Sequence, residues 1–183
     1  MPRDSYLSLK KDRSYGIIDT EMRSVMKKIA FICHGNICRS PMAEFVFKNM
    51  LVSSGREKEF LVVSMATSDE EIFLGVGNTM HSGTVNQLKK HNIPFDKSKR
   101  ACQVNVADYD KYDLFIGMDN YNIRNLKRLF GGDERGKVHL LLDYAGRHGQ
   151  EVADPWYTGN FDLTYEDIIS GCSGLLSTLG EEK

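Results

Sequence analysis

The sequence has little of what a disulfide-stabilised, membrane-embedded or nucleic-acid-binding protein needs. Its 183 residues include only four cysteines, irregularly placed, so we expect free thiols in a reducing compartment. No apolar run reaches the length of a signal-peptide core or a membrane span,. Lysine and arginine number 24 against 25 acidic residues, a formal net charge of −1, which argues against a basic surface for nucleic acid or membranes. We therefore expect a cytoplasmic protein in which any anion is recognised locally.

The length and the apolar content favour one folded domain. Hydrophobic residues make up 41% of the chain, enough for one core, and the chain is too short for two typical domains. Residues 1–25 show neither helical nor strand periodicity, and the first strong apolar run follows Met26,. We expect a domain over residues 26–183. The extension 1–25 is expected to be disordered, an artefact of the assigned start, or a functional arm.

Short apolar segments alternate with segments of helical spacing. The predicted strands are residues 29–32, 60–63, 112–118 and 138–142, and the predicted helices are residues 41–51, 84–91, 120–130 and 164–179,. Such alternation implies an α/β domain with a parallel, doubly wound sheet and helices on both faces.

The segment between the first strand and the first helix gathers residue types that bind and attack anions. It reads Cys33-His34-Gly35-Asn36-Ile37-Cys38-Arg39-Ser40. It follows the carboxyl end of a parallel strand, where open α/β sheets bind ligands. Gly35 and Asn36 tolerate the left-handed backbone that a tight reversal needs. The loop is long enough to wrap a tetrahedral anion with its amide N–H groups pointing inward and a helix N-terminus behind them.

Arg39, Cys33 and Ser40 complete a reactive phosphate site in this interpretation. Arg39 offers a planar fork to two phosphoryl oxygens. A positive environment at a helix N-terminus favours the thiolate form of Cys33, and the Ser40 hydroxyl can donate to that sulfur. The loop lacks the glycines of a dinucleotide fingerprint and the ending of a Walker loop. A lone cysteine after a strand is often only core packing, and Cys33 with Cys38 as half a zinc site lacks a partner pair downstream.

The stretch from Cys33 to Pro41, read as C-x-G-N-x-C-R-S-P, resembles the low-molecular-weight protein tyrosine phosphatase family. The similarity continues through residues 64–68, 118–119 and 154–157, and spans about residues 26–183. The resemblance implies a four-stranded parallel sheet of the phosphotyrosine phosphatase I-like, Rossmann-like class, with no metal or other cofactor. It also implies hydrolysis of phosphotyrosine-type monoesters through a cysteinyl phosphate.

The resemblance assigns roles residue by residue. Cys33 attacks phosphorus, Arg39 and the loop amides hold the phosphoryl oxygens, and Asp154 acts as general acid and then as general base. Asn36 and Ser64 support the loop. Trp156 and Tyr157 follow Asp154 and suit a wall for an aromatic substrate, with partial core packing as the alternative. The remaining members of the predicted loop and its support are His34, Gly35, Ile37, Cys38 and Ser40.

Cys38 has two interpretations of equal weight. In the family it lies close enough to Cys33 for a reversible disulfide that protects the nucleophile from irreversible oxidation. The alternative is a small residue that packs the loop. Cys172 lies on the apolar stripe of the last helix and is expected in the core, and Cys102 has no motif around it.

Several positions depart from the family pattern. Many relatives carry an apolar residue at His34 and an aromatic residue near Glu70, so we expect a more polar substrate rim here. A histidine that supports the loop is common at the position aligned with Lys97. Family members proposed to act on phosphoarginine carry threonine at Ile37, which favours the phosphotyrosine branch for this chain.

The sequence disfavours two alternative functions, and it also suggests the substrates and the oligomeric state. Thiol-dependent arsenate reduction on the same fold needs shuttle cysteines, which Cys102 and Cys172 do not supply. A catalytically silent phosphoprotein-binding module is disfavoured because all three catalytic residues are present. We expect phosphotyrosine-containing proteins or small aryl phosphates as substrates, a monomer or weak dimer, and activity that peaks on the acidic side of neutral.

Overall fold

Four parallel strands form the centre of the molecule in a computed structural model, which describes residues 26–181. They are β1 (Lys27–Cys33), β2 (Phe60–Ala66), β5 (Leu114–Gly117) and β6 (Val138–Leu140). Their order in the sheet is β2-β1-β5-β6, with every neighbouring pair parallel. The predicted parallel sheet is confirmed, whereas the expectations about residues 1–25 lie outside the described residues.

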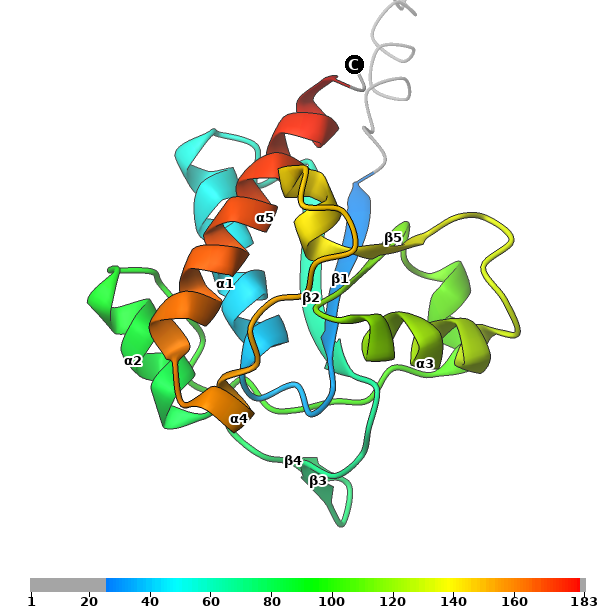
Figure 1. Ribbon diagram of the computed structural model, residues 1–183, viewed down its shortest axis with the longest axis horizontal. Helices are drawn as coiled ribbons and strands as arrows, with labels where there is room; N and C mark the ends of the chain where they lie inside the picture. The colour runs from blue at the N-terminus through cyan, green and yellow to red at the C-terminus, as the bar shows by residue number, and fades with distance from the viewer. Residues whose placement is uncertain (1–25, 182–183) are drawn as a thin grey trace, which may run out of the picture.

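Helices cover both faces of the sheet, as Figure 1 shows. They are α1 (Arg39–Ser53), α2 (Ser82–Lys90), α3 (Asn120–Phe130), α4 (Pro155–Thr158) and α5 (Phe161–Glu181), with short 3₁₀ helices at η1 (Val106–Asp110) and η2 (Leu141–Ala145). Ile29 and Phe31 of β1 pack into a core with α1 and α5, and Ala30 and Ile32 pack into a second core with α3. Because both faces of β1 are buried, its sequence is a continuous apolar run.

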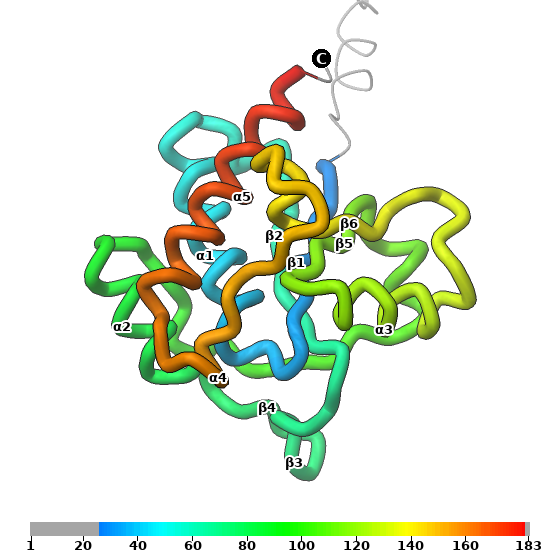
Figure 2. Tube along the Cα trace, in the orientation of Figure 1, coloured from blue at the N-terminus to red at the C-terminus, as the bar shows by residue number. Residues whose placement is uncertain are grey.

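The ends of several elements differ from the predicted ones. The helix α1 starts at Arg39 rather than at Pro41, since a proline in the first helical turn removes no needed hydrogen bond,. The strand β6 ends at Leu140, and the residues predicted to continue it form η2, which packs against α5 (Figure 2). The helix α3 ends where predicted, at Gly131, whose φ of 72° only glycine adopts without strain,.

Several short elements, namely η1, α4 and a hairpin, were not predicted. The strands β3 (Ile72–Phe73) and β4 (Val76–Gly77) form a small antiparallel hairpin outside the main sheet. It projects from the end of the molecule at which β1 runs into α1 (Figure 1). Among residues 26–181, no helix combines the length and the apolar character needed to cross a membrane.

Candidate active site

The Cys33 sulfur lies inside the loop that joins β1 to α1. Its Sγ accepts a hydrogen bond from the Asn36 N–H at 3.3 Å and lies 3.0 Å from the Ser40 Oγ. The Asn36 side-chain amide donates to the same Ser40 oxygen at 2.9 Å. The Ser40 proton is therefore free to point elsewhere, and the sulfur is nearer than its other acceptor, the Met65 carbonyl at 3.4 Å. The loop thus directs two hydrogen-bond donors at the sulfur.

Asn36 joins this loop to two other segments. Its φ of 57° is left-handed, as the sequence predicted for the reversal,. Its amide also donates to the Ser64 Oγ at 2.9 Å, and its Oδ1 accepts from the Cys102 N–H at 3.1 Å. Ser64 in turn donates to the buried Glu44 carboxylate at 2.6 Å. The structure therefore brings Asn36 and Ser64 together as predicted, and adds Cys102 and Glu44 to the network.

Lys99, and not Lys97, reaches this network. The Lys99 Nζ donates to the Ser64 carbonyl at 2.9 Å and lies 3.6 Å from the Glu44 carboxylate. Lys97, at the position where relatives often carry a loop-supporting histidine, is exposed. The loop of residues 91–100 lacks regular structure, and its register cannot be read from periodicity.

Arg39 is held between two carboxylates. Its guanidinium, 4% exposed, contacts Asp119 through Nη1 at 2.7 Å and Asp154 through Nη2 at 2.6 Å. Burial alone would lower the pKa of Arg39, but the negative charges of Cys33, Asp154 and Asp119 outweigh it and raise that pKa,. The guanidinium therefore stays charged and fixed in orientation.

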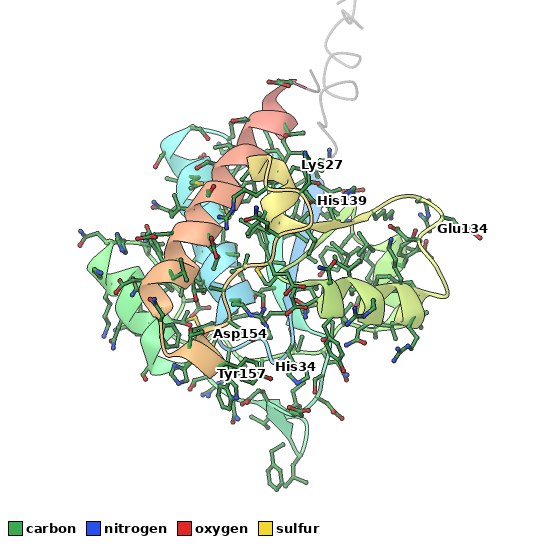
Figure 3. All side chains as sticks on the ribbon, viewed as in Figure 1. Lys27, His34, Glu134, His139, Asp154 and Tyr157 are labelled. Carbon is green, nitrogen blue, oxygen red and sulfur yellow. The ribbon has the colours of Figure 1, made fainter. Side chains whose placement is uncertain are left out.

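Asp154 reaches the site because it caps a helix. Its Oδ1 accepts the Trp156 N–H at 3.0 Å, and Pro155 occupies the first position of α4,. The other carboxylate oxygen is the one bound by Arg39. Figure 3 shows Asp154, His34 and Tyr157 at the same end of the molecule.

A cavity of about 150 Å³ lies over the loop. Its walls are formed by the loop residues Cys33, His34, Gly35, Ile37, Cys38 and Arg39, together with Glu70, Glu71, Asp154, Trp156 and Tyr157. Trp156 and Tyr157 are 63% and 86% exposed, so they border the cavity and do not pack into the core.

The side chains of His34 and Glu70 form the polar rim that the sequence predicts at this edge of the cavity. His34 Nε2 lies 2.9 Å from the Glu70 carboxylate. The next residue, Glu71, packs on Gly35 so closely that a Cβ there would lie 2.8 Å from the Glu71 Cγ. The glycine therefore permits the segment after β2 to form one wall of the cavity.

All four cysteines are free thiols. Burial, and next the charge of Cys33, raise the pKa of Cys38 to about 12, which keeps it protonated at neutral pH. Cys172 is buried in the core as predicted. Within residues 26–181, no group of His, Cys, Asp or Glu side chains is arranged to hold a metal ion.

Sequence reasoning did not assign Asp119, Glu44, Lys99 or Glu71 to the site. Asp119 had a usable signal, because an aspartate before a predicted helix is an N-cap, and its Oδ1 does accept the Asn122 N–H at 2.7 Å,. Nothing local distinguishes the other three. They reach the loop only through tertiary contacts.

Comparisons with known proteins agree with the fold and with the loop motif. A family model described as low molecular weight phosphotyrosine protein phosphatase matches residues 28–183. The low molecular weight protein-tyrosine-phosphatase YfkJ of Bacillus subtilis is 37% identical over 159 residues, which are 86% of this chain and 99% of the relative. The YfkJ crystal structure aligns with a TM-score of 0.80 over 88% of this chain and 99% of its own, at 36% identity. The low molecular weight protein tyrosine phosphatase SP-PTP of Streptococcus pyogenes aligns with a TM-score of 0.72 over 84% and 93%, at 43% identity.

Proposed function

The chain belongs to the low molecular weight phosphotyrosine protein phosphatase family, and we propose that Cys33, Arg39 and Asp154 carry out its reaction. The protein hydrolyses phosphotyrosine-type phosphomonoesters through a cysteinyl phosphate. One observation supports the residue assignment best. The Cys33 sulfur, the Arg39 guanidinium and the Asp154 carboxylate border the same small cavity, each held there by an independent hydrogen bond.

In the first step the Cys33 thiolate attacks phosphorus. The P–S bond forms while the bond from phosphorus to the phenolate oxygen breaks, and Asp154 gives its proton to that oxygen. Arg39 and the loop amides bind the phosphoryl oxygens as their charge is redistributed. A protonated Asp154 no longer forms an ion pair with Arg39, which leaves the guanidinium available to the phosphate.

In the second step water attacks the phosphorus of the cysteinyl phosphate. Asp154, now a carboxylate, takes a proton from that water, and the P–S bond breaks to release inorganic phosphate. The departing thiolate accepts hydrogen bonds from Ser40 and from the Asn36 N–H. These donors stabilise the leaving group and regenerate the nucleophile.

The proposal also covers the domain bounds, the substrates and the cellular location. We assign the phosphatase domain to residues 26–183, with phosphotyrosine-containing proteins or small aryl phosphates as substrates in the cytoplasm. Thiol-dependent arsenate reduction has less support, because Cys172 is fully buried and the Cys102 backbone is bound to Asn36.

Turnover of para-nitrophenyl phosphate and of a phosphotyrosine peptide tests the assignment. We expect the wild type to hydrolyse both and Cys33→Ser to hydrolyse neither while keeping the wild-type circular dichroism spectrum. Cys102→Ser is the matched control and should remain active. Normal turnover by Cys33→Ser would exclude the proposed nucleophile.

A further inference from the structure

His81 lies where three parts of the fold meet. It immediately precedes α2, and its backbone N–H donates to the Ile37 carbonyl of the loop that holds Cys33, at 2.9 Å. Its ring stacks on the Phe161 ring, with centroids 5.1 Å apart and planes 10° apart. The same ring makes a T-shaped contact with the Trp156 ring, with centroids 6.4 Å apart. One residue therefore contacts the active-site loop, α4 and the start of α5.

The helix α2 does not need a histidine at this position. His81 is its N-cap, because Nδ1 accepts the Gly83 N–H at 3.1 Å. Asparagine, aspartate, serine and threonine are the residues that usually supply such an acceptor. An asparagine would do so from an almost identical place, since its Oδ1 and the histidine Nδ1 are both bonded to Cγ. What a histidine adds to the cap is its ring, and the ring contacts are with α4 and α5.

The start of α2 is a fixed support for those contacts. The Thr84 hydroxyl donates to the Cys38 carbonyl at 3.2 Å, which is a second hydrogen bond from α2 to the active-site loop. The Gln87 side-chain amide donates to the Asp162 carboxylate of α5 at 2.9 Å. Because α2 is bound both to the loop and to α5, its N-terminal end keeps a constant place beside the cavity. Figure 1 shows α4 next to this end of α2.

The position of α4 matters because it orients the general acid. The Trp156 N–H donates to one oxygen of Asp154 at 3.0 Å, and Arg39 binds the other oxygen. Once Asp154 is protonated for its role as acid, the ion pair with Arg39 is lost and the bond from Trp156 remains. The Trp156 side chain is 63% exposed, and its ring contacts His81. A displacement of reacting groups by about 1 Å can lower a rate about 10²-fold, so a shift of α4 would impair proton transfer.

We propose that His81 is a positioning residue for the general acid Asp154. Its ring holds α4 through Trp156, while its backbone N–H binds the loop that carries Cys33. The acid and the nucleophile thereby keep their relative places. This inference rests on the proposed function and deepens it, because it assigns a part in the proton-transfer step to a residue that does not line the cavity.

Two substitutions separate the ring of His81 from its role as a cap. His81→Asn keeps an acceptor for the Gly83 N–H and loses the ring contacts, whereas His81→Phe keeps a ring and loses the acceptor. His91→Asn is the matched control, because His91 follows the other end of α2 and stacks on Tyr165 of α5 at 3.8 Å. The measurements are kcat/KM for a series of substituted phenyl phosphates, inhibition by inorganic phosphate, and urea unfolding.

In His81→Asn we expect kcat/KM to fall about tenfold for phenyl phosphate and less than about twofold for para-nitrophenyl phosphate, since the more basic phenolate needs the proton more. The inhibition constant of phosphate and the urea midpoint should keep their wild-type values, because the loop and the helix cap are retained. His81→Phe should show the reverse, a lower urea midpoint with the wild-type dependence on phenol basicity. His91→Asn should also keep that dependence. A purely structural role would rank the two His81 variants alike in stability and in activity.

Three results would overturn the inference. The first is an equal dependence on phenol basicity in His81→Asn and the wild type, and the second is a loss in His81→Phe that matches the loss in His81→Asn. The third is a uniform loss for all phenols with weaker inhibition by phosphate, which would mean a distorted loop. Failure of the proposed function is recognised separately, because Asp154→Ala would then share the wild-type dependence on phenol basicity, and the inference would fall with the acid assignment.

Discussion

At the scale of single residues, Asn36 connects the loop that holds Cys33 to the segments that support it. Its backbone is left-handed, its N–H donates to the Cys33 sulfur, and its side chain binds Ser40 and Ser64. The backbone conformation and the side-chain hydrogen bonds contribute separately to the stability of the loop. Two substitutions at this position distinguish the two contributions.

Asn36→Gly should keep the loop conformation and lose only the side-chain bonds, because glycine adopts positive φ without strain. Asn36→Ala loses both, so we expect it to be less stable than Asn36→Gly by about 1 kcal/mol. Urea unfolding measures this order, and kcat/KM for para-nitrophenyl phosphate should follow it, with wild type above glycine and glycine above alanine. An alanine variant as active as the wild type would show that the network does not position the loop.

Asp154→Ala should slow the hydrolysis of aryl phosphates roughly 10²- to 10⁴-fold, the usual scale for a lost general acid. The loss should grow as the leaving phenol becomes more basic, since a basic phenolate most needs the proton. The measurement is kcat across a series of substituted phenyl phosphates. If the variant and the wild type depend equally on phenol basicity, Asp154 is not the acid.

Some residues of the site belong to a local sequence pattern, and others reach the site from distant parts of the chain. Cys33, Asn36, Arg39 and Ser40 lie in one loop whose residue types already indicate anion binding, and Asp154 was carried over from the family motif. Glu44 and Lys99 reach the same site from α1 and from an irregular loop through tertiary contacts. Their roles depend on the packing of segments distant in sequence, which no local pattern encodes.

At the scale of elements, segments with a clear apolar pattern were predictable and segments without one were not. Continuous apolar runs mark the strands β1 and β2, and apolar residues at helical spacing mark the helices α3 and α5,. The hairpin has two-residue strands and a Leu-Gly turn in place of Asn-Gly, so neither periodicity nor turn chemistry marks it,. Residues 141 and 142 were predicted to end a strand, but they begin η2, which packs against α5.

The packing of α5 on η2 depends on a close backbone approach at Gly174. A Cβ at this position would lie 2.0 Å from the Tyr144 carbonyl oxygen, so we expect Gly174→Ala to lower the free energy of unfolding by more than about 2 kcal/mol. Gly180→Ala is the matched control on the same helix, because its Cβ would meet only Arg56 at 3.6 Å. Urea unfolding of both variants is the measurement, and equal stabilities would contradict this account of the packing.

At the scale of the whole molecule, buried thiols make stability depend on pH. Burial raises the pKa of Cys38 from 9.0 to about 12, and burial also raises the pKa of Cys172. Above about pH 9 the unfolded chain ionises these thiols while the folded chain keeps them protonated. Because the unfolded state then binds fewer protons, stability is fully present below pH 9 and falls as the pH rises towards 12, by up to about 1.4 kcal/mol per pH unit for each thiol.

Urea unfolding between pH 8 and pH 11 under reducing conditions measures this slope. In Cys172→Ala the slope should be smaller by about 1.4 kcal/mol per pH unit, whatever the stability of the variant at pH 8. The control Cys102→Ala removes a more exposed thiol and should change the slope less. A slope unaltered by Cys172→Ala would mean that this thiol ionises in the folded state.

The most direct test of the account is the identity of the phosphorylated residue. In the proposed mechanism Asp154 activates the attacking water, so rapid acid quenching of Asp154→Ala with para-nitrophenyl phosphate, a substrate that needs little acid catalysis, should trap the intermediate. Mass spectrometry of the digested protein should then find one phosphoryl group, on the peptide that contains Cys33. A phosphoryl group on any other residue, or turnover by a Cys33→Ser variant at the wild-type rate, would contradict the mechanism.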